Sequence, residues 1–249
     1  MSKSNLLIVT GGNRGIGRQI ALSAVEAGWR VAISYGRNRQ SADDMVAASD
    51  GRIEAFALDV ADPGSVTHFF QEIEMSMGPS QALVTAAGVD NGPRSITDID
   101  HDFVHSTFAV NVVGLILCCR EFAARAMAKG DAGVIVNISS MAATIGGRAQ
   151  KSVYAASKGA VDVFTVGAAK EFAPHGISVF SVRPGVTRTD MTSTMLADPT
   201  TKAAIEATIA SGAVADPIEI AMPVIDLISG KFNYASGSML NLGGGGFIT

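Results

Sequence analysis

Seven short apolar runs recur along the chain and are separated by helix-forming segments, a pattern that restricts the possible folds severely. The runs are NLLIV at 5–9, RVAIS at 30–34, IEAFALD at 53–59, ALVTAAG at 82–88, GVIVNIS at 133–139, ISVFSVRP at 177–184 and GSMLNLG at 237–243. Most are apolar throughout, which is typical of parallel strands covered on both faces. Helices are predicted over 15–28, 63–77, 100–129 and 153–174. Repeated βαβ units predict an α/β fold with a doubly wound, Rossmann-type, mostly parallel sheet of seven strands.

Composition limits what such a domain can bind. The 249 residues contain no linker or repeat, so we expect one domain over 1–249. The net charge of −4 argues against a nucleic-acid partner or an anionic membrane surface. The longest apolar stretch, VVGLILCC at 112–119, is shorter than a membrane span, and the adjacent Cys118 and Cys119 are expected to be buried reduced thiols. We therefore expect a cytoplasmic protein.

The segment TGGNRGIG, residues 10–17, joins the first predicted strand to the first predicted helix. Glycines permit a tight turn there, and the start of the helix presents backbone N–H groups and a positive dipole to an anion. The spacing is G-G-x-x-G-x-G, which differs from the common dinucleotide fingerprint G-x-G-x-x-G. Taken alone, the turn is equally compatible with a purely structural role.

Two arginines favour a particular dinucleotide. The second strand ends in SYGRN without an acidic residue for a ribose 2′-hydroxyl, and Arg37 follows it while Arg14 lies within the glycine turn. Two guanidinium groups suit a 2′-phosphate, so NADP(H) is favoured over NAD(H). Asp59 is a candidate acceptor for the adenine amino group. Its alternative role is to cap the next helix, for which Asp62 is better placed.

The segment YAASK places Tyr154 and Lys158 one helical turn apart on the same face. An ammonium group near a phenol favours the phenolate, so we expect Lys158 to lower the pKa of Tyr154 towards neutral pH. Two serines, Ser139 and Ser140, end the strand GVIVNIS, where a hydroxyl group can donate to a substrate carbonyl or cap the next segment. Asn111 lies in an otherwise apolar helix and is expected to join a buried polar network.

Together these motifs resemble the short-chain dehydrogenase/reductase family over nearly the whole chain. The matching segments are TGGNRGIG, LDV, AAG, Asn111, NISS, YAASK and RPGVTRTDM. The resemblance implies a catalytic tetrad of Asn111, Ser140, Tyr154 and Lys158. Tyr154 would be the general acid and base, Ser140 would polarise the carbonyl, Lys158 would hold the nicotinamide ribose and Asn111 would position a water. The NADP(H) site expected from these segments comprises Gly11, Asn13, Arg14, Gly15, Ile16, Gly17, Arg37, Asp59, Val60, Ala86, Ala87, Gly88, Tyr154, Lys158, Pro184, Gly185, Val186, Thr187 and Thr189. No metal is expected.

The resemblance leaves the substrate open between a small ketone or polyol and a 3-oxoacyl carrier-protein thioester. Asp131 and His175 stand where the carrier-protein reductases tend to have basic residues, which disfavours an acidic carrier protein. A non-catalytic NADP(H)-binding sensor is a weaker alternative, because all four tetrad residues are present. Residues 187–212 are helix-prone and form either a substrate lid or an ordinary surface pair of helices. The resemblance also implies a homodimer or homotetramer.

The sequence departs from the family pattern at two places near the expected site. TAAG at 85–88 replaces the usual NNAG, so the hydrogen bonds that brace the end of the fourth strand are uncertain. Ser140 lies one residue further from Tyr154 than is usual, and we expect the loop GGRAQKS at 146–152 to contain the extra residue.

Overall fold

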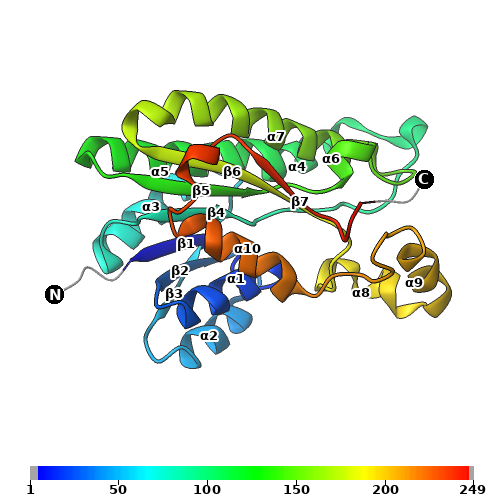
Figure 1. The fold of residues 1–249 in the computed structure, drawn as a ribbon, viewed down its shortest axis with the longest axis horizontal. Coiled ribbons are helices and arrows are strands. Elements are labelled where there is room, and N and C mark those ends of the chain that lie inside the picture. The colour runs from blue at the N-terminus through cyan, green and yellow to red at the C-terminus, as the bar shows by residue number, and fades with distance from the viewer. Residues whose placement is uncertain (1–4, 247–249) are drawn as a thin grey trace.

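A parallel seven-stranded sheet with the order β3-β2-β1-β4-β5-β6-β7 forms the centre of the fold (Figure 1). The computed structural model describes residues 5–246. Every strand pairing within this range is parallel, and the register aligns Ile8 with Ala32 on one side and with Leu83 on the other. The strands are β1 (Leu6–Thr10), β2 (Arg30–Tyr35), β3 (Ile53–Ala57), β4 (Ala82–Thr85), β5 (Gly133–Ile138), β6 (Ile177–Pro184) and β7 (Met239–Leu242).

All seven predicted strands are confirmed, and their burial explains why the apolar runs are continuous. Every residue of β1, β4 and β5 is buried, because helices cover both faces of the sheet. β7, at the sheet edge, is partly exposed. The predicted α/β class and doubly wound topology are therefore correct.

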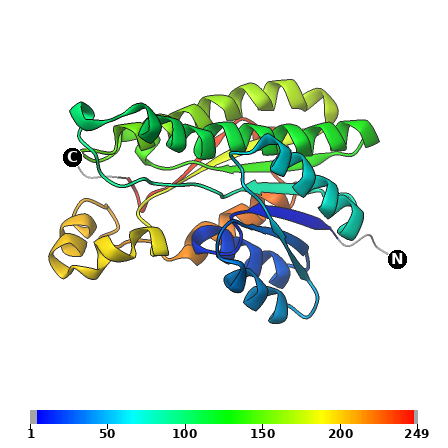
Figure 2. The same cartoon turned by 180° about the vertical axis from the view of Figure 1, so that it is seen from behind.

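Helices form one layer on each face of the sheet (Figures 1 and 2). The helices of one face are α1 (Gly15–Glu26), α2 (Arg39–Ala47) and α10 (Pro217–Ile228). Those of the other are α3 (Pro63–Met77), α4 (His101–Phe108), α5 (Leu115–Lys129), α6 (Ala142–Ile145) and α7 (Ser152–Phe172). Each face has its own apolar core, one around Phe69, Phe70 and Phe122 and one around Ile20, Ile33 and Phe180. Cys118 and Cys119 are buried free thiols in the first of these cores.

The single helix predicted over 100–129 is wrong in one respect. A π-helical segment, η2 (Ala109–Gly114), separates α4 from α5 and contains Asn111. A Cβ atom on Gly114 would lie 2.5 Å from the carbonyl oxygen of Val60. The π segment therefore packs directly against the backbone of the loop between β3 and α3. π-bulges of this kind are frequent at functional sites.

No apolar stretch as long as a membrane span is expected from the sequence, and the helical segment 101–129 differs from that expectation. By length and composition it is the one helix in the described range that could cross a membrane, and a third of its most apolar window is buried. In the fold it packs on the sheet beside α3 and α7 as a covering helix of an α/β domain. Core helices pass the same length and composition test, so this finding adds little evidence for a membrane location.

Residues 187–212 form two short helices beyond the carboxyl ends of the strands. These are α8 (Asp190–Ala197) and α9 (Pro199–Glu206), and both views place them away from the two helical layers (Figures 1 and 2). They share a small apolar cluster that includes Ile205, Ile209 and Val214. The remaining turns are the 3₁₀ segments η1 (Ile96–Asp98), η3 (Ala173–His175) and η4 (Asn233–Ala235).

Candidate active site

The glycine turn between β1 and α1 is closed by contacts that exclude side chains. Gly11 has a φ of +64°, and its N–H donates to Ser34 Oγ at 2.8 Å. A Cβ atom on Gly17 would lie 2.5 Å from the carbonyl oxygen of Gly11. No side chain caps the amino end of α1, and its first turn contains no acidic residue. The free N–H groups at this helix end therefore suit an anionic ligand such as a pyrophosphate.

The loop after β2 is tied to this turn, which brings the two predicted arginines to one region. Asn13 Nδ2 donates to the Asn38 carbonyl at 3.1 Å, and Ser41 Oγ donates to the Asn13 carbonyl at 2.7 Å. Arg14 and Arg37 are the sequence neighbours of the joined Asn13 and Asn38, and both are exposed. The Arg14 guanidinium donates to the Gly88 carbonyl at 3.5 Å, so its side chain extends towards the end of β4 and not towards Arg37. Among residues 5–246, Arg37 has no hydrogen-bond or ion-pair partner, so its charge is available to a ligand.

Asp59 and Val60 follow β3 at the same edge of the sheet. Asp62 caps α3 by accepting from the Gly64 N–H at 2.8 Å, as the sequence predicts. Asp59 is exposed, and its Oδ1 accepts only from the Ala61 N–H at 2.9 Å, so the carboxylate keeps free acceptor capacity. Val60 is buried.

The end of β4 is braced although the family's two asparagines are missing. Thr85 Oγ1 donates to Asn137 Oδ1 at 2.8 Å, and the Ala87 N–H donates to Thr10 Oγ1 at 3.2 Å. The threonine of TAAG itself and Thr10 of β1 therefore supply hydrogen bonds at the strand end that the missing asparagines placed in doubt. Ala86, Ala87 and Gly88 are half-buried at this strand end.

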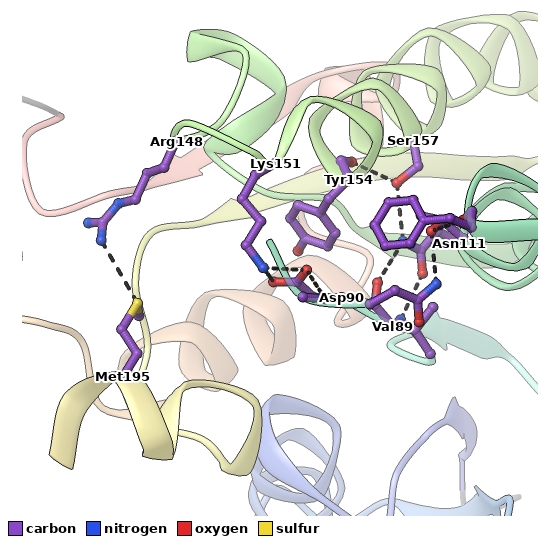
Figure 3. Close-up of polar contacts among 12 residues, drawn as sticks. Val89, Asp90, Asn111, Arg148, Lys151, Tyr154, Ser157 and Met195 are labelled. Carbon is purple, nitrogen blue, oxygen red and sulfur yellow. Dashed lines mark hydrogen bonds and ion pairs between the residues drawn. The ribbon is translucent and has the colours of Figure 1, made fainter. Parts of the chain in front are cut away.

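Asn111 holds the backbone of Val89, the next residue in the loop after β4, by hydrogen bonds. It is fully buried, its Oδ1 accepts from the Val89 N–H at 2.8 Å, and its Nδ2 donates to the Val89 carbonyl at 2.9 Å and to Ser157 Oγ at 3.1 Å (Figure 3). The expected buried polar network is therefore present. A Cβ atom on Gly88 would lie 3.4 Å from Asn111 Oδ1 and 3.6 Å from Lys158 Nζ, which places the strand end between these two groups.

Tyr154, Ser140 and Lys158 lie together beyond β5. Ser140 lies beside Tyr154, and its hydroxyl group lowers the Tyr154 pKa as a neighbouring hydrogen-bonding group. Ser139 instead donates to the Lys158 carbonyl at 3.1 Å and is buried, so Ser140 is the serine beside the tyrosine. Lys158 Nζ donates to the Ile138 carbonyl at 2.8 Å and lies 5.8 Å from the centre of the Tyr154 ring. The loop 146–151 separates α6 from α7 and accommodates the longer spacing between Ser140 and Tyr154.

The expected lowering of the Tyr154 pKa is wrong for this structure. Burial raises the pKa of Tyr154 to about 12, and the hydrogen bond from Ser140 opposes this only in part. The negative charge of Asp90 raises it further. Desolvation also acts on Lys158, whose pKa falls to about 8 despite the opposing effect of Asp162. The error arose because spacing reveals the charge of a neighbour and not the cost of removing both groups from water.

The end of β6 completes the site opposite the glycine turn. The backbone of Pro184, Gly185, Val186 and Thr187 leads into Thr189, which starts α8 through a capping box with Thr192. A Cβ atom on Gly15 would lie 3.5 Å from Thr189 Cβ. The start of α8 is therefore adjacent to the glycine turn. Ile16, in the first turn of α1, is half-buried.

Three charged residues near the tetrad were missed by sequence reasoning. Lys151 and Asp90 form an ion pair near Tyr154, with Nζ–Oδ1 and Nζ–Oδ2 distances of 2.7 and 2.8 Å. Asp162 is buried and accepts from Ser181 Oγ at 2.7 Å and from Arg183 Nε at 2.8 Å. Helical spacing offered a signal, because Lys151 and Asp162 lie three residues before Tyr154 and four after Lys158. Asp90 is distant in sequence and offered no such signal.

Comparisons with known proteins agree with this architecture. The sequence profile of the short chain dehydrogenase family matches residues 5–200. An uncharacterized oxidoreductase of Escherichia coli, YgfF, is 34% identical over 245 residues, covering 96% of this chain and 99% of its own length. The human 3-oxoacyl-[acyl-carrier-protein] reductase is 35% identical and covers 95% of each chain. The solved structure of ElxO with NADP bound superposes with a TM-score of 0.89 at 26% identity, covering 98% of each chain.

The family profile covers well over half of the chain, and the relatives align over almost all of it. The chain belongs to the short-chain dehydrogenase family and has the fold of an oxidoreductase.

Proposed function

We propose that the protein is an NADPH-dependent oxidoreductase that reduces a ketone to a secondary alcohol, or runs the reverse reaction. The observation that carries the proposal is the grouping of Tyr154 with Ser140 and with Lys158, whose Nζ lies 5.8 Å from the Tyr154 ring centre and close to Gly88 at the end of β4. The experiment is to follow the loss of NADPH absorbance with a panel of ketones. Absence of turnover across a broad panel, with NADPH binding intact, would favour the alternative of a non-catalytic sensor.

The site fits NADP(H) in its shape and in its charges. The side-chain-free glycine turn and the uncapped end of α1 suit the pyrophosphate, and the exposed, unpaired guanidinium group of Arg37 suits a 2′-phosphate. The Arg14 guanidinium would have to leave the Gly88 carbonyl to join it. The NADP-bound relative of the same fold supports this choice. When bound, the cofactor supplies or accepts the hydride.

The residues of the chain then handle the proton and the developing oxyanion. Ser140 and Tyr154 direct their hydroxyl groups to one substrate oxygen, and Tyr154 gives it a proton during reduction. The raised pKa of Tyr154 keeps its hydroxyl protonated at neutral pH, as the role of proton donor in reduction requires. The Lys158 ammonium stabilises the resulting phenolate and holds the nicotinamide ribose. Asn111 uses both amide hydrogens on Val89 and Ser157, so it would hold a relay water only through Oδ1.

We propose a small ketone, a polyol or another free hydroxy compound as the substrate. The human relative raises the alternative of a 3-oxoacyl carrier-protein thioester. Against it stand Asp131 and His175, which are exposed, because an acidic carrier protein needs basic residues at its docking surface. Activity with a 3-oxoacyl thioester far above that with every small ketone would favour the alternative.

Three further features belong to the same proposal. We propose that α8 and α9 act as a substrate lid, because they lie at the mouth of the site. We propose a homodimer or homotetramer, because Val113 and Val163 are 48% and 75% exposed on neighbouring helices. A cytoplasmic location is proposed from the charge and the free thiols.

Replacing Arg37 by alanine is expected to raise the Kd for NADPH roughly 10- to 100-fold while changing that for NADH by less than about threefold. Only NADPH has the 2′-phosphate that the Arg37 guanidinium would bind. Titration of each nucleotide by nicotinamide fluorescence measures both constants. Arg52→Ala is the matched control, because Arg52 is also exposed but lies at the opposite, amino end of β3. An equal loss for the two nucleotides would show that Arg37 does not read the 2′-phosphate.

Replacing Asp162 by asparagine is expected to move the alkaline limit of activity to lower pH. The Lys158 ammonium is present below its pKa of about 8 and is lost above it, and the Asp162 carboxylate raises that pKa. Removing the carboxylate therefore deprotonates Lys158 at a lower pH. A pH profile of kcat/KM measures the change, with Asp226→Asn, an exposed residue on α10, as the control. An alkaline limit at the same pH in both variants would contradict the assignment of that limit to Lys158.

A further inference from the structure

The Asp90–Lys151 ion pair lies directly beside Tyr154. Figure 3 shows the Tyr154 hydroxyl pointing towards Lys151 Nζ and the Asp90 carboxylate. The two charged side chains are 21% and 23% exposed, so the pair is neither sealed in the core nor free in solvent. Asp90 comes from the loop after β4, and Lys151 immediately precedes α7. The loop after β4 and the segment that leads into α7 therefore contribute one charged side chain each.

Backbone contacts hold the pair in place. The Arg94 N–H donates to the Gln150 carbonyl at 3.0 Å, which joins the loop after β4 to the loop before α7. The Gly92 N–H donates to Asp90 Oδ1 at 3.2 Å, and the Lys151 N–H donates to the Arg148 carbonyl at 3.0 Å. Both side chains are thus preorganised, and a ligand that meets them loses little further conformational entropy.

The pair retains hydrogen-bonding capacity that only some substrates use. An ammonium has three N–H groups and a carboxylate has about four acceptor positions. Lys151 donates to Asp90, and Asp90 accepts from Lys151 and Gly92, so donor capacity remains on Lys151 and acceptor capacity remains on Asp90. The pair is neutral as a unit and therefore selects neither anions nor cations. A hydroxyl group, which donates to a carboxylate and accepts from an ammonium, matches it best.

The pair also lines a small hollow beside Tyr154. The other side chains that line this hollow are both apolar and polar: Ile99, Phe103, Val153, Asn91, Thr107 and Gln150. A carbonyl held by Tyr154 and Ser140 brings the substituents on its neighbouring carbon next to the groups that flank the tyrosine hydroxyl. A methylene there would cover the charged pair without replacing its water, which costs free energy. A hydroxyl group there would replace that water.

We propose that Asp90 and Lys151 bind a hydroxyl group on the carbon adjacent to the reacting carbonyl, so that the substrate class is an uncharged α-hydroxyketone and, in reverse, a vicinal diol. The inference rests on the proposed ketone reductase function and narrows its substrate. Recognition of this hydroxyl group would also distinguish the enzyme from acyl thioester reductases, whose substrates have a methylene group at that carbon.

The test compares matched ketones that differ by one hydroxyl group. We would measure kcat/KM with NADPH for acetoin against 2-butanone and for 2-hydroxycyclohexanone against cyclohexanone. Hydrogen bonds to charged groups predict a preference for the hydroxylated member of roughly 10- to 100-fold. The ratio should fall towards one in Lys151→Met and in Asp90→Asn, and Lys151→Arg should keep part of it. Lys170→Met, at an exposed position of the same helix, should leave the ratio unchanged.

The outcomes separate this inference from the proposed function. Thermal melting and NADPH binding identify any variant that fails to fold, and Asp90→Asn, which keeps the shape of the side chain, is the milder of the two. Turnover of both ketones with a ratio near one in the native protein, or a high ratio that survives both substitutions, would overturn the inference alone. A stronger preference for a charged 2-oxo acid such as pyruvate would also overturn it. No turnover of any ketone would overturn the proposed function and the inference together.

Discussion

Replacing Tyr154 by phenylalanine is expected to lower kcat for ketone reduction by about 10³-fold or more, with NADPH binding unchanged within about threefold. The phenyl ring can occupy the same space, but the hydroxyl group beside Ser140 is lost. General acid catalysis contributes about 10²–10⁴-fold when the donor is positioned, and Tyr154 also helps to orient the substrate oxygen. Steady-state NADPH oxidation gives kcat, and nicotinamide fluorescence gives the binding constant.

Tyr234→Phe is the matched control, because Tyr234 is fully exposed in η4 and far from the tetrad in the chain. It should leave both kcat and NADPH binding at the native values. If Tyr154→Phe kept more than about a tenth of the native kcat, an ordered water or Ser140 would have to be the proton donor, and the mechanism given above would be wrong.

The strands could be predicted because parallel β-strands covered on both faces are apolar at nearly every position. The five residues of β1 illustrate this, since all are buried and the first four, Leu6 to Val9, are apolar without interruption. The start of α3 was also predictable, because Asp62 before Pro63 is a local capping signal. The π segment at 109–114 was not, because one extra residue in a helical turn leaves the apolar composition unchanged.

The candidate site was predictable where its residues are local in sequence. Tyr154 and Lys158 share one helix face, and Ser139 and Ser140 end a strand. Contacts over long sequence distances were not visible. Asp90 reaches Lys151 across 61 residues, and Asp162 reaches Arg183 across 21. The predicted direction of the Tyr154 pKa shift was wrong for a related reason. The pKa depends on burial by elements that the local sequence does not contain.

The glycine turn is the second place where a single change is expected to have a large effect. We expect Gly17→Ala to raise the Kd for NADPH about 100-fold or more, because its Cβ would lie 2.5 Å from a backbone oxygen of Gly11. No side chain can rotate to relieve that contact, so the turn and the start of α1 must move apart. The N–H groups that would bind the pyrophosphate move with them. Fluorescence titration measures the binding loss, and thermal melting measures any loss of stability.

Two further alanine variants separate the effect on the turn from a general effect of removing glycine. Gly15→Ala has room for its Cβ, 3.5 Å from Thr189, but must adopt a φ of +53°, so it should weaken NADPH binding less than Gly17→Ala. Gly167→Ala lies at an exposed, sterically open position of α7 and should raise stability by about 0.5–1 kcal/mol without changing binding. Equal NADPH affinities in Gly17→Ala and Gly167→Ala would mean that the cofactor does not rest on this turn. In that case the position of Tyr154 relative to the nicotinamide would have to be explained by a different cofactor site.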